Sequence, residues 1–129
     1  MLGGNEVALR KRIFVVEDHP AVRQGIVETL NREPDLVVCG EADDATPALV
    51  AIAADGVDLV LADIQLRSSN GIDLIRELRR SHPALPVIAM TMFDPVCYER
   101  SARAAGANGF VVKQDGAKKM IEVIRGALK

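Results

Sequence analysis

Residues with reactive side chains follow four of the apolar runs in this chain of 129 residues. They are Glu17 and Asp18 after the run 13–16, Asp63 after 59–62, Thr91 after 87–90 and Lys113 after 110–112. Three carboxylates crowded into one site cannot all stay ionised without a cation, and hard oxygen ligands suit Mg²⁺. An aspartate can attack phosphorus, while a hydroxyl and an ammonium can bind phosphoryl oxygens. The set therefore indicates metal-assisted phosphoryl transfer to Asp63.

The elements that must position these side chains can be read from the apolar runs themselves. In chain order the runs are IFVV (13–16), LVVCG (36–40), LVLA (59–62), VIAM (87–90) and FVV (110–112). They do not alternate with polar residues, which is typical of strands covered on both faces in a parallel sheet. Helical periodicity fills the gaps between them. Five β–α units predict an α/β fold with a parallel sheet and helices on both faces.

Helix boundaries follow from capping residues and apolar spacing. Val22, Ile26 and Leu30 recur every fourth residue and indicate the first helix. Thr46 is predicted to cap the second helix, with Pro47 at its first position. Gly56 is expected to end the second helix, and the third should have Ile72, Leu74, Ile75 and Leu78 on its apolar face. A fourth helix is expected from Asp94-Pro95 to Gly106. A fifth is expected over 116–128, with Met120, Ile121, Ile124 and Leu128 on one side.

Ligands of an open α/β sheet bind outside the carboxyl ends of its strands. The reactive residues at the ends of the apolar runs should therefore converge on one crevice. Glu41, which comes after the second apolar run, would lie at the sheet edge.

Composition narrows the classes of protein. A net charge of −2 gives no drive toward nucleic acid or a membrane surface, and no apolar run approaches the roughly 20 residues that span a bilayer. Residues 1–11 are expected to form a flexible polar tail, followed by one domain over 12–129. Cys39 and Cys97 lack metal-ligand spacing, so we interpret both as buried free thiols in a reducing compartment, the cytoplasm.

Taken together, residues 12–128 resemble the receiver domain of a two-component response regulator. The stretch from Asp63 to Gly71 and the run AAGANGFVVK (104–113) match that family in spacing and residue type. VEDHPAVRQGI (16–26) is similar in particular to the NarL/FixJ subfamily. The resemblance implies a flavodoxin-like (βα)5 three-layer sandwich with strand order 2-1-3-4-5.

The resemblance also implies a role for each residue. Asp63 would be the phosphoacceptor, Thr91 and Lys113 would contact the phosphoryl group, and Thr91 with Phe110 would form the switch. The implied ligands of Mg²⁺, with Mn²⁺ as a substitute, are Asp18, Asp63, the backbone carbonyl of Gln65 and, through water, Glu17. Such a domain is a signalling switch rather than an enzyme, although it would catalyse its own phosphoryl transfer and dephosphorylation.

Expected partners come from the same resemblance. A histidine kinase or a phosphotransfer protein would supply the phosphoryl group. A homodimer would form through the face made by the fourth helix, fifth strand and fifth helix. A DNA-binding output domain, absent from this chain, would carry transcriptional control, and the receiver itself would touch neither nucleic acid nor membrane.

Three other functions remain as alternatives. A hydrolase of the haloacid dehalogenase class would need a second aspartate where Gln65 stands. A flavodoxin-like cofactor binder would need a phosphate-cradling loop where Glu17 and Asp18 stand. A degenerate receiver that acts only as an interaction module is the third, because Met92 follows Thr91 and could narrow access to Asp63.

Several remaining residues have simple structural interpretations. His19-Pro20 should turn the chain into the first helix. The glycines Gly71, Gly106 and Gly109 are interpreted as permissive turn or cap positions, and Arg76, Arg79 and Arg80 as a solvated helix face. The loop after Asp63 departs from the family pattern, with Arg67 in place of a common proline, followed by the polar Ser68-Ser69-Asn70. Gln114 is a further departure, since proline is frequent after the lysine.

Overall fold

The computed structural model describes residues 10–92 and 95–129, and for residues 95–97 the backbone alone. The strands are β1 (Lys11–Val16), β2 (Leu36–Ala42), β3 (Leu59–Asp63), β4 (Val87–Thr91) and β5 (Gly109–Val112). The helices are α2 (Pro20–Asn31), α3 (Ala45–Ala54), α4 (Gly71–Ser81), α5 (Pro95–Ala105) and α6 (Ala117–Ala127), with a short 3₁₀ turn, η1 (Lys113–Asp115), after β5.

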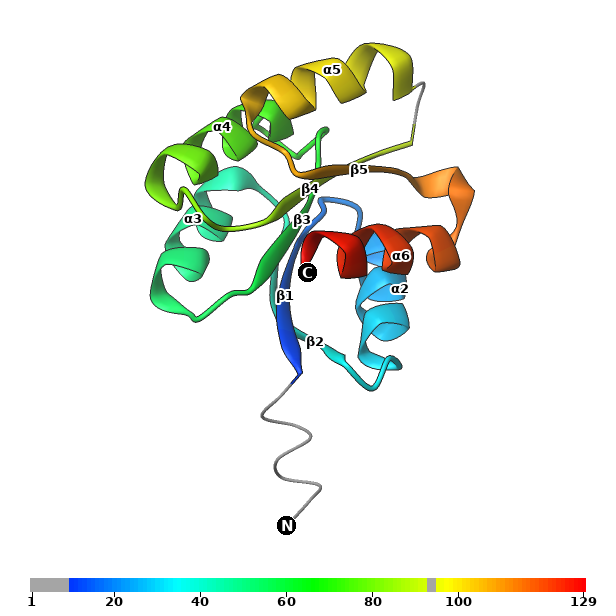
Figure 1. The fold of residues 1–129 in the computed structure, drawn as a ribbon. Helices are drawn as coiled ribbons and strands as arrows, with labels where there is room; N and C mark the ends of the chain where they lie inside the picture. Colours follow the sequence, from blue (N-terminus) through cyan, green and yellow to red (C-terminus); the bar gives the residue numbers. More distant parts are fainter. Residues whose placement is uncertain (1–9, 93–94) are drawn as a thin grey trace.

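The five strands form one parallel sheet in the order β2-β1-β3-β4-β5, which confirms the predicted flavodoxin-like topology (Figure 1). Val16 at the end of β1 lies level with Ala62, the residue before Asp63. Thr91 at the end of β4 pairs in register with Val112, the residue before Lys113. The carboxyl ends of β1, β3, β4 and β5 therefore meet at one edge of the sheet.

The sheet separates two apolar cores, and this explains why its strands read as continuous apolar runs. In β1, Phe14 and Val16 pack against α3, α4 and α5, whereas Ile13 and Val15 pack against α2 and α6. Figure 1 shows the same division, with α2 and α6 together on one face of the sheet. Because both faces are covered, every position of the central strand β3 is buried.

The helix starts confirm one prediction and correct another. Pro20 is the first residue of α2, as expected, and His19 before it caps the helix. For α3 the prediction was wrong: Asp44 caps the helix by accepting a hydrogen bond from the Ala45 N–H at 3.0 Å, and Pro47 is the third residue. Thr46 already lies within the helix. Proline is tolerated there because the N–H groups of a first turn have no partner within the helix.

Two further expectations are only partly covered by the described residues. Strand β1 begins at Lys11, inside the predicted tail, while residues 1–9 and Asp94 lie outside the described residues. Cys39 is a free thiol that is half-buried rather than buried, and burial raises its pKa. The structure does not describe the side chain of Cys97. Within the described part of the chain, no helix has the length and apolar character to cross a bilayer.

Candidate functional site

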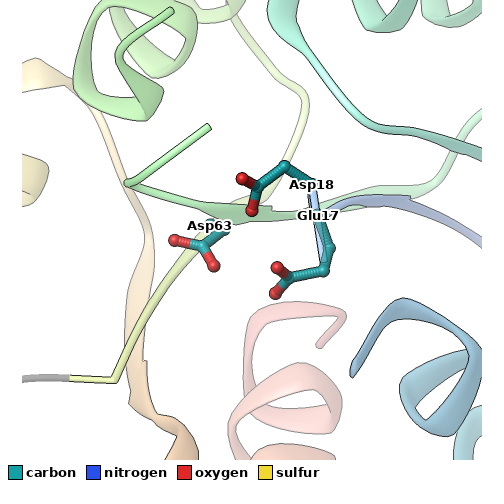
Figure 2. Close-up of side chains that lie close together, drawn as sticks. All are labelled: Glu17, Asp18 and Asp63. Atoms are coloured by element: carbon teal, nitrogen blue, oxygen red, sulfur yellow. The ribbon is translucent and has the colours of Figure 1, made fainter. Parts of the chain in front are cut away.

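Three carboxylates meet at the carboxyl edge of the sheet. Glu17, Asp18 and Asp63 each offer one oxygen, and these oxygens all lie within 4.8 Å of one another. Figure 2 shows the three side chains gathered at the ends of β1 and β3. Asp63 is the last residue of β3, and Glu17 extends the ladder of β1 by donating its N–H to Ala42 O at 2.9 Å. The neighbouring central strands therefore bring the predicted acidic set together.

The cluster is buried, which makes its charge costly. Glu17 is 1% exposed and Asp63 4% exposed, while Asp18 is half-buried. Burial raises the pKa of the Glu17 carboxyl to about 7; the hydrogen bond from Lys113 opposes this rise, and the neighbouring Asp63 carboxylate adds to it. Such a site favours any bound cation, because a cation removes the repulsion between the carboxylates.

Lys113 supplies a cation from the chain itself. Its Nζ donates to Glu17 Oε1 at 2.5 Å and also to Asp63 Oδ2. Burial by itself would lower the pKa of Lys113, but the hydrogen bonds to Asp63 and Glu17 outweigh that effect and raise it. The predicted lysine therefore lies in the site, where it joins the end of β5 to those of β1 and β3.

The donor set fits a hard divalent cation. All three acidic side chains offer oxygen, the ligand that Mg²⁺ prefers, and the half-buried Asp18 leaves one side open to water. One ammonium does not fully balance the buried charge, because the pKa of Glu17 stays raised despite its contact with Lys113. The residues present are therefore compatible with a magnesium ion at this edge.

A cleft gives access to the cluster. It has a volume of about 240 Å³ and is lined by Glu17, Asp18, His19, Val22, Asp63, Gln65, Met92 and Lys113. Met92 lines this cleft and is 45% exposed; that its side chain narrows access to Asp63 stays a prediction. Thr91 is buried at the end of β4, and Phe110 in β5 is half-buried against the core that faces α3, α4 and α5.

The turn after β1 is held by His19 and by a residue that sequence reasoning missed. His19 donates its N–H to Glu17 Oε2 at 3.1 Å, and its Nδ1 accepts from the Val22 N–H at 3.5 Å. Arg23 donates from Nη1 to the Glu17 carbonyl at 2.8 Å and from Nε to Glu41 Oε1 at 3.0 Å. The signal was present: Arg23 lies in the first turn of α2, shortly after the acid pair, and Glu41 directly follows the apolar run 36–40 of the neighbouring strand β2.

The turn after β3 depends on a close approach at Gly71. The Gln65 N–H donates to Asp63 Oδ1 at 2.7 Å, and Gly71 N–H donates to Ile64 O at 2.9 Å. A Cβ on Gly71 would lie 2.1 Å from the carbonyl oxygen of Asp63. Gly71 is therefore required by packing against the backbone of Asp63, and its φ is not positive. This corrects its interpretation as a permissive cap.

The other two glycines differ in whether backbone conformation or packing constrains them. Gly106 has φ +119°, as expected for a permissive position that ends a helix. At Gly109 φ is not positive, and an added Cβ would lie 2.7 Å from Ile88 Cδ1 and 3.0 Å from Val123 Cγ1, so the constraint comes from side-chain packing rather than from backbone conformation.

The interpretation of three arginines as a solvated face is correct for two of them. Arg76 and Arg80 are exposed and pair with acids one turn earlier on α4. Arg79 is half-buried instead, because it faces the loops at the opposite edge of the sheet. Its guanidinium donates to the carbonyl oxygens of His82, Pro83 and Gly106 and to Asn108 Oδ1.

Comparisons with known proteins agree on one family. The family model described as "Response regulator receiver domain" matches residues 13–125. The DNA-binding transcriptional activator DevR/DosR of Mycobacterium tuberculosis is 36% identical over 102 residues, which cover 79% of this chain and 47% of that protein. The response regulator GacA of Pseudomonas viridiflava is 34% identical over 114 residues, covering 88% of this chain and 53% of that protein.

A solved structure gives the same result. The two-component response regulator of the LuxR family from Aurantimonas sp. SI85-9A1 superposes with a TM-score of 0.88 at 31% identity, covering 92% of this chain and 85% of that chain. The chain spans about half the length of the two curated relatives, DevR/DosR and GacA.

Proposed function

The chain belongs to the family of response regulator receiver domains, and from that premise we propose that it is a signalling switch phosphorylated on Asp63. The observation that carries the proposal is the position of Asp63: it ends a central strand, within reach of Glu17, Asp18 and Lys113. The phosphoryl donor would be a histidine kinase or a phosphotransfer protein of a two-component system.

We further propose that the acidic cluster holds Mg²⁺, with Mn²⁺ as a substitute. Asp18, Asp63 and the backbone carbonyl of Gln65 would be direct ligands, and Glu17 would act through water. When bound, the ion would offset the negative charge of the carboxylates and of the incoming phosphoryl oxygens. Lys113, which now pairs with both Glu17 and Asp63, would then be free to turn toward those oxygens.

In the reaction, a carboxylate oxygen of Asp63 attacks the phosphorus of a phosphohistidine. A P–O bond forms as the P–N bond breaks, and the bonding electron pair returns to the imidazole of the donor. Lys113 and the Thr91 hydroxyl bind the phosphoryl oxygens and stabilise their charge. Met92, at the rim of the cleft, limits how closely a donor or a hydrolytic water can approach.

Signal output would follow from the movement of Thr91. As Thr91 shifts toward the phosphoryl group, Phe110 turns inward and repacks the face formed by α5, β5 and α6. Phe110 has no hydroxyl, so its two positions differ in packing alone. The new charge thus shifts a conformational population, and the repacked face would support a homodimer. Transcriptional control through an attached output domain is supported by the relatives, among them a DNA-binding transcriptional activator.

Intact-mass measurement after incubation with acetyl phosphate and Mg²⁺ tests the phosphoacceptor. The wild-type chain should gain one phosphoryl group, and Asp63→Asn should gain none because it lacks the nucleophilic carboxylate. Asp73→Asn is the matched control, since it removes an exposed carboxylate in α4 and should still be phosphorylated. Phosphate on the Asp63→Asn variant would show that another residue is the acceptor.

A further inference from the structure

Two consecutive serines bind one carboxylate on a neighbouring loop. Ser68 Oγ donates to Asp44 Oδ2, and Ser69 Oγ donates to Asp44 Oδ1. Ser68 and Ser69 belong to the loop between β3 and α4, whereas Asp44 precedes α3. We name this contact between Asp44, Ser68 and Ser69 the serine clamp. It joins two loops whose residues are separated by 24 and 25 positions in the chain.

The carboxylate of the clamp is fixed at its own end. Asp44 is the N-cap of α3, and the N–H of Ala45 donates both to Asp44 Oδ1 at 3.0 Å and to Ser69 Oγ at 3.2 Å. The hydrogen bonds from Ser68 and Ser69 lower the pKa of Asp44 to about 2, so its carboxylate is ionised at neutral pH. An ionised carboxylate can accept both hydroxyl protons at once.

The clamped loop is the one that leaves Asp63. Its base is closed by a β-bridge between Gln65 and Asn70, and its tip is held by the clamp. Gln65 therefore lies between two fixed points, Asp63 on one side and the clamp on the other. A backbone carbonyl can be moved only by moving the backbone, so the position of the Gln65 carbonyl depends on how firmly the loop is held.

We propose that Asp44 is a positioning residue for the metal site, holding through Ser68 and Ser69 the loop that carries Gln65. This inference rests on the proposed function, in which the Gln65 carbonyl is a metal ligand. Mg²⁺ requires near-octahedral ligands at short distances, whereas Ca²⁺ accepts a variable geometry. Loosening the loop should therefore weaken the binding of Mg²⁺ much more than that of Ca²⁺.

The variant Ser68→Ala/Ser69→Ala tests the proposal while leaving Asp44 to cap α3. Calorimetric titration should show the Kd for Mg²⁺ raised about fivefold and the Kd for Ca²⁺ changed by less than about twofold. The effect on Mg²⁺ should be smaller than that of removing a residue in direct contact with a metal ligand, because the serines act through the backbone of the loop. Ser68→Thr/Ser69→Thr keeps both hydroxyls and should restore the affinity for Mg²⁺. Asp73→Asn is the control, because it removes only an exposed ion pair with Arg76 within α4.

Three results would overturn the proposal. One is a wild-type affinity for Mg²⁺ in the double alanine variant. If that variant also had a lower thermal midpoint in EDTA, the clamp would stabilise the fold without positioning the metal ligand. Another is an equal loss of affinity for both ions. The third is Asp73→Asn weakening Mg²⁺ binding as much as the loss of the serines. Failure of the proposed function would show separately, as a wild-type chain that neither binds Mg²⁺ nor accepts a phosphoryl group.

Discussion

Replacing Gly71 by alanine should destabilise this domain, although glycine-to-alanine changes in helices ordinarily stabilise proteins. Gly71 is the first residue of α4, and its added Cβ would lie 2.1 Å from Asp63 O and 2.4 Å from Ile64 Cα. Both are backbone atoms, so neither can rotate out of the way. Relief requires a shift of β3, which ends in Asp63, or of α4, which packs against the backbone of Asp63.

The size of the effect follows from opposing contributions. Alanine gains about 1 kcal/mol over glycine through helix propensity. Overpacking against the backbone costs about 2 kcal/mol, and lengthening the hydrogen bond from Gly71 N–H to Ile64 O, now 2.9 Å, costs about 1 kcal/mol more. The free energy of unfolding should therefore fall by about 2 kcal/mol. Gly25→Ala is the matched control: Gly25 lies within α2 with no atom within 4 Å of an added Cβ, so this variant should gain about 1 kcal/mol.

Urea unfolding of both variants in EDTA measures the two changes, with the slope m checked for two-state behaviour. Transfer from acetyl phosphate should also slow in Gly71→Ala and stay unchanged in Gly25→Ala. The reasoning is refuted if Gly71→Ala is as stable as the wild type, because the backbone would then yield without cost. It is equally refuted if Gly25→Ala loses stability.

Two other predictions concern charge. In EDTA the domain should lose stability as pH rises from about 4.5 to about 7, because burial raises the pKa of Glu17 from 4.5 to about 7 and the folded state therefore holds its proton more tightly than the unfolded chain. Urea unfolding across that range should show this fall, and Glu17→Gln should flatten it; a wild-type profile that rises instead would contradict the burial argument. Arg79→Ala should lower the free energy of unfolding by about 2 kcal/mol through lost hydrogen bonds to two loops, whereas Arg76→Ala, at an exposed ion pair, should change it by less than about 0.5 kcal/mol. Equal effects of the two arginine changes on the urea midpoint would contradict the assignment of Arg79 as a structural contact.

The order and type of the elements were predictable because the central strands β3 and β4 are buried throughout, on both faces. That burial requires uninterrupted apolar runs, which the sequence displays directly. Capping was less predictable, since Asp44 and Thr46 are both good N-cap residues and lie two positions apart. In the structure Asp44 is the cap, and its carboxylate also accepts hydrogen bonds from Ser68 and Ser69 of a distant loop, a contact that the local sequence does not reveal.

The residues of the candidate site were predictable because strand ends converge in a parallel sheet, so each polar residue directly after an apolar run is a candidate. Their contacts were not. Lys113 approaches Glu17 across the ends of intervening strands, and Arg79 reaches loops 27 residues away at Gly106. Gly71 looked like a cap, since nothing in its local sequence reveals that α4 packs against the backbone of Asp63.

The ion pairs of Lys113 have a consequence for how the domain folds. They join residues 96 and 50 positions apart, so they can form only after β1, β3, β4 and β5 have taken their places in the sheet. A ligand that binds the folded site and not the unfolded chain should therefore stabilise the sheet as a whole, and it should slow by the same factor the amide hydrogen exchange in β1, β3 and β5 that proceeds through global unfolding.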